Sequence, residues 1–221
     1  MTAKFENNNL IVLNPLSGDK VDTLTVSDEK YINDSILNAK IDSSWPSLSV
    51  SKRVSYINKF RKELLKNKKE IASTIKNETG KIDFDITVEI LTSLEHLKQI
   101  ASIAKKALKI QRRNAGLMKT KKAYVKYEPL GVAGVIAPWN YPLATPLTSS
   151  AEALIAGNNV LLKPSEHTPL TSKLLKKIWD NAIEYKNAFQ IIIGGADVGG
   201  SIVKNNNIDI ICFTGSTSVG R

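Results

Sequence analysis

Hydrophobic and polar residues alternate near the start of the chain, from Leu10 to Val26, on either side of the polar turn Ser17-Gly18-Asp19. A period of two residues is typical of a strand with one buried face. Turn-forming residues between two such runs join them into an antiparallel pair. The segment therefore predicts a β-hairpin.

The next hundred residues have the three- and four-residue hydrophobic spacing of helices. Ser27 or Asp28 can cap the first helix, and Gly80 is suited to end a later one. One helix is predicted from Val54, Ile57, Phe60 and Leu64. A longer one is predicted from the stripe Ile90, Leu94, Leu97, Ala101, Ala104 and Leu108. We expect this stripe to pack in the core rather than against a partner.

After Tyr124, hydrophobic runs of strand length alternate with segments of helical pattern. In order, the segments read AYVKYEP, GVAGVIAP, PLTSSAEALIAG, NVLLKP, TPLTSKLLKKIWDNAI, FQIIIGG, VGGSIVKN and IDIICFTG. This alternation is typical of βαβ units, whose parallel sheet is covered by helices on both faces. Thr168 followed by Pro169 favours a helix start at that point. The sequence predicts an α/β fold: a Rossmann-like parallel sheet preceded by a hairpin and a helical segment.

The chain has a single cysteine, Cys212, in the run IDIICFTG. Alternation puts Ile208, Ile210 and Cys212 on one face of this strand, and Ile211 and Phe213 on the other. Two apolar faces predict a central strand of a parallel sheet. We therefore expect Cys212 to lie in the core, with a high pKa and little nucleophilicity. A lone cysteine also excludes an internal disulfide framework and fits a reducing compartment.

Composition and charge narrow the class of protein. The chain has 221 residues, of which 42% are hydrophobic and 24% charged, as in globular proteins. Its net charge is +10, and residues 98–126 hold ten Lys or Arg but no Asp or Glu. Because Tyr124 is the only aromatic residue there, we favour a solvated basic face over a nucleic-acid site. The N-terminus lacks an apolar run, so we expect a cytoplasmic protein without membrane or nucleic-acid partners.

Four polar loops follow the predicted strands: APWNYP, KPSEHTP, GGADVGG and GSTSVG. Open parallel sheets bind ligands at such strand ends. Lys163 and Glu166 suit the hydroxyls of a ribose, although an ordinary surface ion pair has the same pattern. Ser216 suits a phosphate, although it also suits a simple helix cap. Asn140 could stabilise charge on a substrate oxygen, or could be a turn residue beside an aromatic plug. GGADVGG does not fit the G-x-G-x-x-G fingerprint.

Read in this order, GVIAPWNYP, NVLLKPSEHTP, GGADVGG and CFTGSTSVGR resemble the aldehyde dehydrogenase superfamily, and NETGK (residues 77–81) extends the resemblance into the helical part. The resemblance implies that residues 1–124 form the hairpin and helical part of a cofactor-binding domain, and residues 125–221 its βαβ dinucleotide-binding part. It also implies that the fold is incomplete relative to that of the family. In that family, a cysteine attacks the aldehyde, hydride passes to NAD(P)+, and a glutamate activates water to release a carboxylic acid.

Matching the motifs implies a role for individual residues. Asn140 matches the asparagine that holds the oxyanion, and Tyr141 matches a residue lining the aldehyde entrance. The resemblance implies NAD as the cofactor through Glu166, with NADP still possible because of Lys163. No metal site is predicted. The residues implied in cofactor binding are Ile136, Pro138, Trp139, Lys163, Glu166, Gly195, Gly199 and Ser216.

The nucleophilic cysteine and the general-base glutamate of the family match positions beyond Arg221, and Cys212 is not at the matching position. We therefore expect the cofactor-binding portion of an aldehyde dehydrogenase, inactive alone and homo-oligomeric when complete. One alternative is a split enzyme, in which a complementing C-terminal polypeptide supplies the nucleophile. Another is a non-catalytic basic binding protein.

Overall fold

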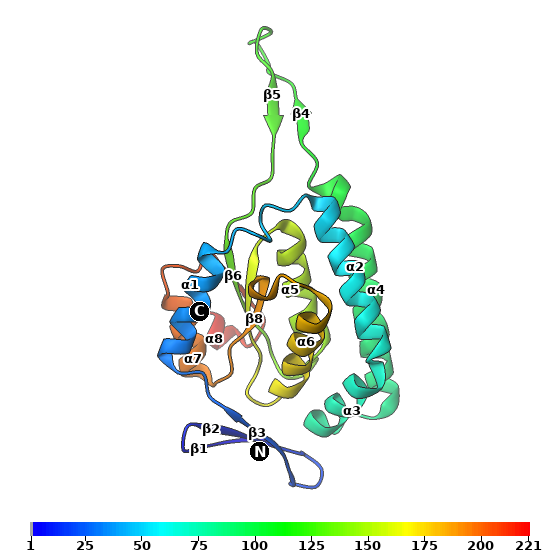
Figure 1. Cartoon of the computed structure of the whole chain (residues 1–221), viewed down its shortest axis with the longest axis vertical. Coiled ribbons are helices and arrows are strands. Elements are labelled where there is room, and N and C mark those ends of the chain that lie inside the picture. Colours follow the sequence, from blue (N-terminus) through cyan, green and yellow to red (C-terminus); the bar gives the residue numbers. More distant parts are fainter. Residues whose placement is uncertain (1) are drawn as a thin grey trace.

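The central feature of the fold is a four-stranded parallel sheet. The computed structural model describes residues 2–221, and the strand order of this sheet is β8-β7-β6-β9 (Figure 1). In its register, Val135 lies between Leu162 of one neighbour and Cys212 of the other. The predicted parallel sheet is thus confirmed. Its strands are β6 (Val132–Ile136), β7 (Asn159–Lys163), β8 (Phe189–Ile191) and β9 (Ile210–Phe213).

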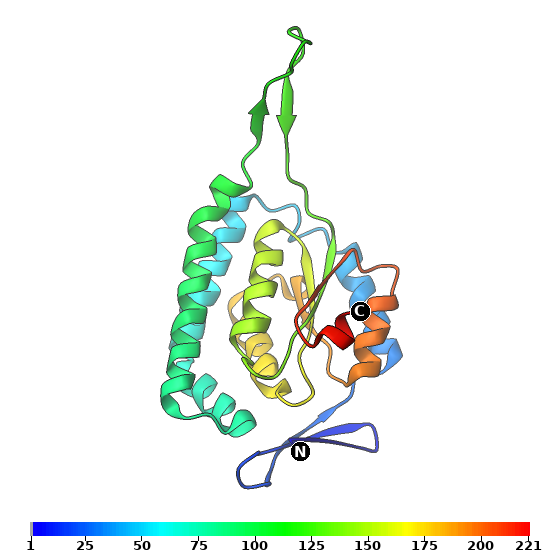
Figure 2. The same ribbon diagram turned by 180° about the vertical axis from the view of Figure 1, so that it is seen from behind.

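Helices cover both faces of this sheet, as Figures 1 and 2 show from opposite sides. On one face lie α5 and α6, with α2, α3 and α4 packed outside them. On the other face lie α1 and α7. The helices are α1 (Glu29–Ile41), α2 (Val50–Lys66), α3 (Lys68–Thr79), α4 (Asp83–Ala107), α5 (Ala144–Ala156), α6 (Pro169–Ala182), η1 (Lys186–Ala188), α7 (Ala196–Lys204) and α8 (Thr217–Gly220).

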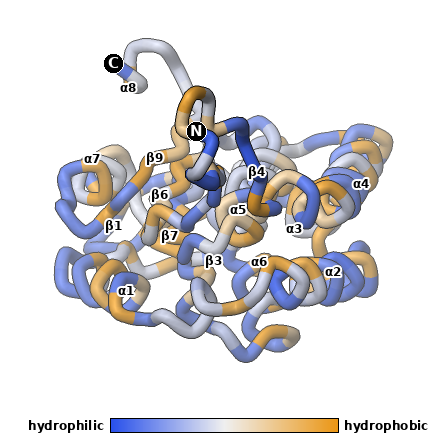
Figure 3. Tube along the Cα trace, turned by 90° about the horizontal axis from the view of Figure 1, so that it is seen from above, coloured by the Kyte–Doolittle hydropathy of each residue, from blue (hydrophilic) through white to orange (hydrophobic). Residues whose placement is uncertain are grey.

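Two cores result from the alternation of side chains along the strands. Ala133 and Val135 of β6 face the larger core under α5 and α6, whereas Val132 faces the smaller one under α1 and α7. In Figure 3 the hydrophobic positions gather on β6, β7 and β9, and the outer sides of the helices are largely hydrophilic. Trp179 is fully buried in the larger core, where Trp45 meets it edge-on at 5.6 Å between ring centroids.

The helical N-terminal part forms as its pattern predicts. Asp28 caps α1, and its Oδ1 accepts a hydrogen bond from the Tyr31 amide at 2.7 Å. Gly80 ends α3 in the left-handed conformation, with φ of 68°, which favours glycine. The predicted stripe of α2 is buried, and so is that of α4 except for Leu108, which is half-buried after the helix end. These predictions are confirmed.

Two strands differ from the predicted arrangement. The N-terminal hairpin, formed by β2 (Asn9–Leu13) and β3 (Lys20–Thr25), is joined by a third strand, β1 (Ala3–Glu6). The run AYVKYEP was predicted to enter the parallel sheet, which is wrong. Its strand β5 (Ala123–Val125) instead pairs antiparallel with β4 (Gln111–Arg113). The run lacks two apolar faces, since Tyr124 is exposed on the same face as the exposed Lys122 and Lys126.

The pair β4–β5 forms a ribbon that projects from the body of the protein (Figure 1). Exposed cations of the basic segment lie on this ribbon and on its turn, namely Arg112, Arg113, Lys119, Lys121 and Lys122. The preference for a solvated basic face over a nucleic-acid site stays a prediction. The division of the chain at residue 124 also stays a prediction, and β5 runs across that boundary.

The position of β9 corrects part of the expectation for Cys212. Within residues 2–221, β9 is an edge strand and not a central one, and Ile210 is 36% exposed. Ile208 precedes the strand and packs with Ile211 against the smaller core, so it does not share a face with Cys212. Cys212 is half-buried against the larger core. Burial raises the pKa of its thiol, as expected.

Candidate functional site

A cleft forms where the four polar loops leave the sheet. Hydrogen bonds between neighbouring strands continue to the carboxyl ends of the strands. The Thr214 amide donates to the Ile136 carbonyl at 3.0 Å, and the Ala137 amide donates to the Lys163 carbonyl at 3.1 Å. Because the strands are parallel, their loops emerge together at one edge. They enclose about 550 Å³, which we call the strand-end cleft. Its lining is Ile136, Ala137, Pro138, Trp139, Lys163, Ser165, Glu166, Ala196, Gly199, Gly200, Val203, Lys204, Phe213, Thr214, Gly215, Ser216 and Val219.

One wall of the strand-end cleft is a face of α7. Ala196, Gly200 and Lys204 are spaced four residues apart on this face, so they form one stripe along the helix. A Cβ atom placed on Gly200 would meet no heavy atom within 4 Å. The glycine therefore leaves room in the cleft that a larger residue would fill.

Lys163 and Glu166 supply opposite charges to the cleft. Lys163 is buried at the end of β7, and its Nζ lies 3.6 Å from Oε2 of Glu166, longer than a normal hydrogen bond. Burial lowers the pKa of Lys163, although Glu166 and, to a lesser extent, Asp197 oppose this effect. The loose pair leaves donors and an acceptor that a polyhydroxyl ligand can bind.

The structure brings most of the predicted cofactor residues together. All except Gly195 line the strand-end cleft. Gly195 is the N-cap of α7 and lies outside that lining, where an added Cβ would meet Asp197 and Phe5 of β1. A role for any of them in cofactor binding stays a proposal.

Asn140 and Tyr141 lie beside the cleft rather than in its lining. Both are on the loop between β6 and α5, residues 137–143, which we call the Asn140 loop. The Asn140 side chain is exposed, and the Tyr141 side chain is 53% exposed. The Lys81 ammonium lies over the Tyr141 ring, 4.3 Å from its centroid.

Sequence reasoning missed two buried glutamates that hold the helices after these loops. Glu89 of α4 accepts hydrogen bonds from the amides at the start of α5, and Glu78 of α3 accepts them from the amides at the start of α6. Thr168 is the N-cap of α6, as predicted, but its side chain makes no capping bond. Helical spacing does place Glu78 on the same face as Ile71 and Ile75. It likewise places Glu89 on the same face as Ile86. The local pattern cannot show their partners, which are 54 to 93 residues away.

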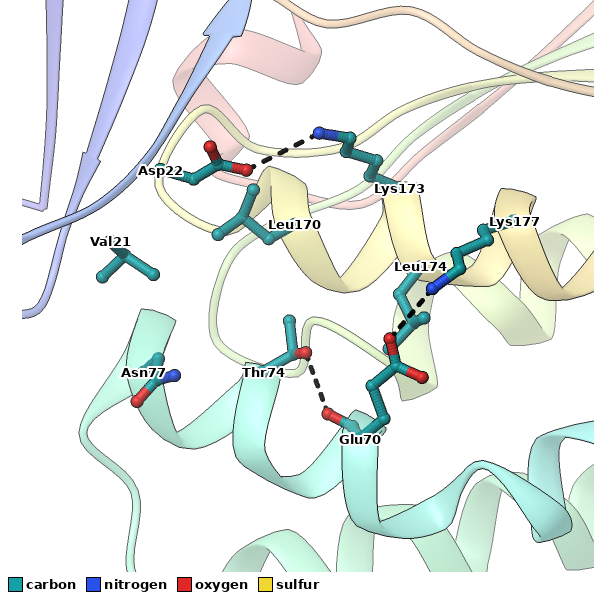
Figure 4. A pocket seen from close by; sticks show the side chains of 9 residues that line it. All are labelled: Val21, Asp22, Glu70, Thr74, Asn77, Leu170, Lys173, Leu174 and Lys177. Carbon is teal, nitrogen blue, oxygen red and sulfur yellow. Dashed lines mark hydrogen bonds and ion pairs between the residues drawn. The ribbon is translucent and has the colours of Figure 1, made fainter.

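A second recess, of about 410 Å³, lies between β3, α3 and α6 (Figure 4). Lys173 points toward Asp22 with a 3.6 Å separation, and Lys177 points toward Glu70 with a 3.2 Å separation. None of its lining residues belongs to the four strand-end loops. Because open parallel sheets bind ligands at their strand ends, the strand-end cleft is the better candidate site.

Comparison with known proteins places this fold in a family. The model of the aldehyde dehydrogenase family matches residues 2–221. A probable coniferyl aldehyde dehydrogenase of Pseudomonas aeruginosa is 36% identical over 179 residues, covering 80% of this chain and 37% of that protein. The NAD+-dependent benzaldehyde dehydrogenase of Pseudomonas putida is 32% identical over 212 residues, covering 95% and 43% respectively.

Solved structures agree with the family match. The crystal structure of an aldehyde dehydrogenase from Brucella melitensis biovar abortus superimposes with a TM-score of 0.91 at 28% identity, covering 96% of this chain and 44% of that one. Betaine aldehyde dehydrogenase of Staphylococcus aureus, solved with NAD+, has the same fold with a TM-score of 0.91 at 22% identity, covering 96% of this chain and 44% of that one.

The chain belongs to the aldehyde dehydrogenase family. It spans less than half the length of the curated relatives that it matches. Among residues 2–221, the structure contains no helix that is long and apolar enough to cross a membrane.

Proposed function

We propose that the strand-end cleft binds NAD(P)+, and that the protein to which this chain belongs oxidises aldehydes to carboxylic acids. The convergence of the four loops on one cleft, with Lys163 and Glu166 at its wall, carries this proposal. The substrate in the proposal is a small-molecule aldehyde. When bound, the cofactor supplies the acceptor for the hydride that leaves the substrate.

The residues present fit a dinucleotide. Glu166 can accept hydrogen bonds from ribose hydroxyls, and Lys163 can donate to a ribose or phosphate oxygen. The hydroxyls of Thr214 and Ser216 line the same cleft and can donate to phosphate oxygens. The space beside Gly200 admits an extended ligand. The apolar walls, which include Trp139, suit a flat ring.

In this proposal, the exposed Asn140 amide donates to the substrate oxygen as negative charge develops on it. Cys212 has no part in bond formation, because its thiol is half-buried against the core and its pKa is raised. We therefore expect the isolated 221-residue chain to be inactive. NADH formation from NAD+ and benzaldehyde should equal that of a protein-free control, and NADH above that background would contradict this expectation.

A carboxylate beside a ribose disfavours the 2′-phosphate of NADP+ through like-charge repulsion. Glu166→Gln removes this charge and should narrow the preference for NAD+ over NADP+ by about 5-fold. Calorimetric titration with both dinucleotides measures the ratio of the two dissociation constants. Glu29→Gln, on the exposed start of α1 and outside the cleft lining, is the matched control and should keep the wild-type ratio. An unchanged ratio in Glu166→Gln would place Glu166 away from the ribose.

We also propose homo-oligomeric assembly and a cytoplasmic location for the complete protein. The β4–β5 ribbon supports assembly, because within residues 2–221 each of its two strands has an edge free for pairing with another chain. The single cysteine supports a reducing compartment.

A further inference from the structure

Glu89 is a buried carboxylate that contacts the end of the Asn140 loop. Its side chain has 0% exposure, and its Oε1 accepts hydrogen bonds from the Leu143 amide at 2.9 Å and the Ala144 amide at 3.2 Å. These amides stand at the start of α5, where Leu143 offers no side-chain cap. Glu89 therefore serves as a distant cap, and its charge suits the positive end of the helix.

The second oxygen of Glu89 connects it to the loop by another route. Its Oε2 lies 2.7 Å from Nζ of Lys81, which is the ammonium that lies over the Tyr141 ring. Lys81 thus contacts the loop before Pro142, through the Tyr141 ring. Glu89 contacts it after Pro142, through the Leu143 and Ala144 amides. Asn140 is the residue directly before that ring.

Fold stability alone does not require an ion pair between Glu89 and Lys81. A buried ion pair gains little over a well-packed apolar pair, because both charges lose their hydration. Charge-assisted hydrogen bonds do fix position, since they are short and directional. The chain keeps such a pair at the loop that carries the exposed Asn140 amide.

We propose that Glu89 is a positioning residue that acts with Lys81 to fix the Asn140 loop beside the strand-end cleft. The proposal rests on the proposed function, because only that function makes the position of the Asn140 loop important. The placement itself can be measured without cofactor or turnover. Glu89 is not among the residues that line the cleft, and it acts through Lys81 and through the start of α5.

Glu78 provides a matched comparison within the same chain. It is also buried, and it accepts hydrogen bonds from the Leu170 and Thr171 amides at the start of α6. Both glutamates accept amide hydrogen bonds at the start of a helix, but they hold different helices. A change in Glu78 should therefore leave the Asn140 loop in place.

The test combines amide hydrogen exchange with tryptophan fluorescence. Trp139 on the Asn140 loop is 58% exposed, whereas Trp45 and Trp179 have 0% exposure, so acrylamide quenching reports on this loop. Glu89→Gln should speed exchange of the Leu143 and Ala144 amides by about 10-fold, because their hydrogen bonds to a charged oxygen become weaker bonds to a neutral one. Lys81→Met should raise quenching of Trp139. Lys81→Arg should keep quenching at the wild-type level, because arginine keeps the ion pair and the contact with the ring.

Glu78→Gln should speed exchange at Leu170 and Thr171 only. The proposal would be overturned if Glu89→Gln and Glu78→Gln speeded exchange at all four amides alike, because that is the result of general destabilisation. It would equally be overturned if Lys81→Met left the quenching of Trp139 unchanged. Absence of NAD+ binding would contradict the proposed function but would not change the amide exchange rates or the quenching of Trp139.

Discussion

Replacement of Gly200 by leucine is expected to lower the affinity for NAD+ by about 100-fold, or about 3 kcal/mol of binding free energy. This is the upper end of the cost of adding a side chain to space that is already filled, here by the bound ligand. Gly200 lies on the cleft face of α7, and a Cβ placed there would enter open space. A leucine can therefore be accommodated by the fold but occupies the room that the ligand needs. The folded state should not weaken, because leucine favours a helix more than glycine does.

Isothermal titration calorimetry with NAD+ measures this effect, and urea unfolding checks the fold. Ser201→Leu is the matched control, because it adds a leucine to the same helix at the next position, on an exposed side outside the cleft lining. It should bind NAD+ as the wild type does. Equal affinities for Gly200→Leu and Ser201→Leu would show that the ligand binds elsewhere.

A second large effect is expected in the pH dependence of stability. Burial raises the pKa of Glu78 to about 7 from its ordinary value of 4.5, although hydrogen bonds from Thr171 and Leu170 oppose this rise. Because the pKa is higher in the folded state, that state binds the proton more tightly. The resulting stabilisation is fully present below about pH 4.5 and is lost as the pH rises through about 7. The shift corresponds to about 3 kcal/mol of unfolding free energy.

Glu78→Gln removes this titration and keeps an acceptor of nearly the same shape. Urea unfolding at about pH 5 and about pH 8 should show the wild type losing about 2.5 kcal/mol more than this variant between the two conditions. Comparing the two proteins cancels the contributions of Asp42 and Asp209, whose lowered pKa values act in the opposite direction. Equal losses in the two proteins would mean that Glu78 does not titrate in this range.

The parts of the fold that could be predicted are those whose cause is local. Capping by Asp28, the end of α3 at Gly80 and the alternation in β6 depend on neighbours in the chain. The cleft could be predicted because parallel strands bring their loops to one edge, whatever the order of the strands. The cleft face of α7 could also have been predicted, since Gly200 follows Gly199 in the motif GGADVGG.

The parts that could not be predicted depend on contacts between distant segments. Strand order decides that β9 lies at an edge, and a hydrophobic run alone cannot reveal its neighbours. The separation of β5 from the parallel sheet has the same cause, because it depends on pairing with β4. Glu78 and Glu89 lie on the apolar faces of their helices, but the sequence does not show which groups they meet there. Only the fold brings them to the starts of α6 and α5.

The central claim is that the strand-end cleft holds the dinucleotide. Amide chemical-shift mapping of the isotope-labelled chain during titration with NAD+ tests it most directly. We predict that the shifts that change with NAD+ belong to the strand ends at Ile136, Lys163 and Phe213 and to the cleft face of α7. Changes confined to the recess around Glu70 and Lys177, or a spectrum that NAD+ leaves unaltered, would contradict the claim.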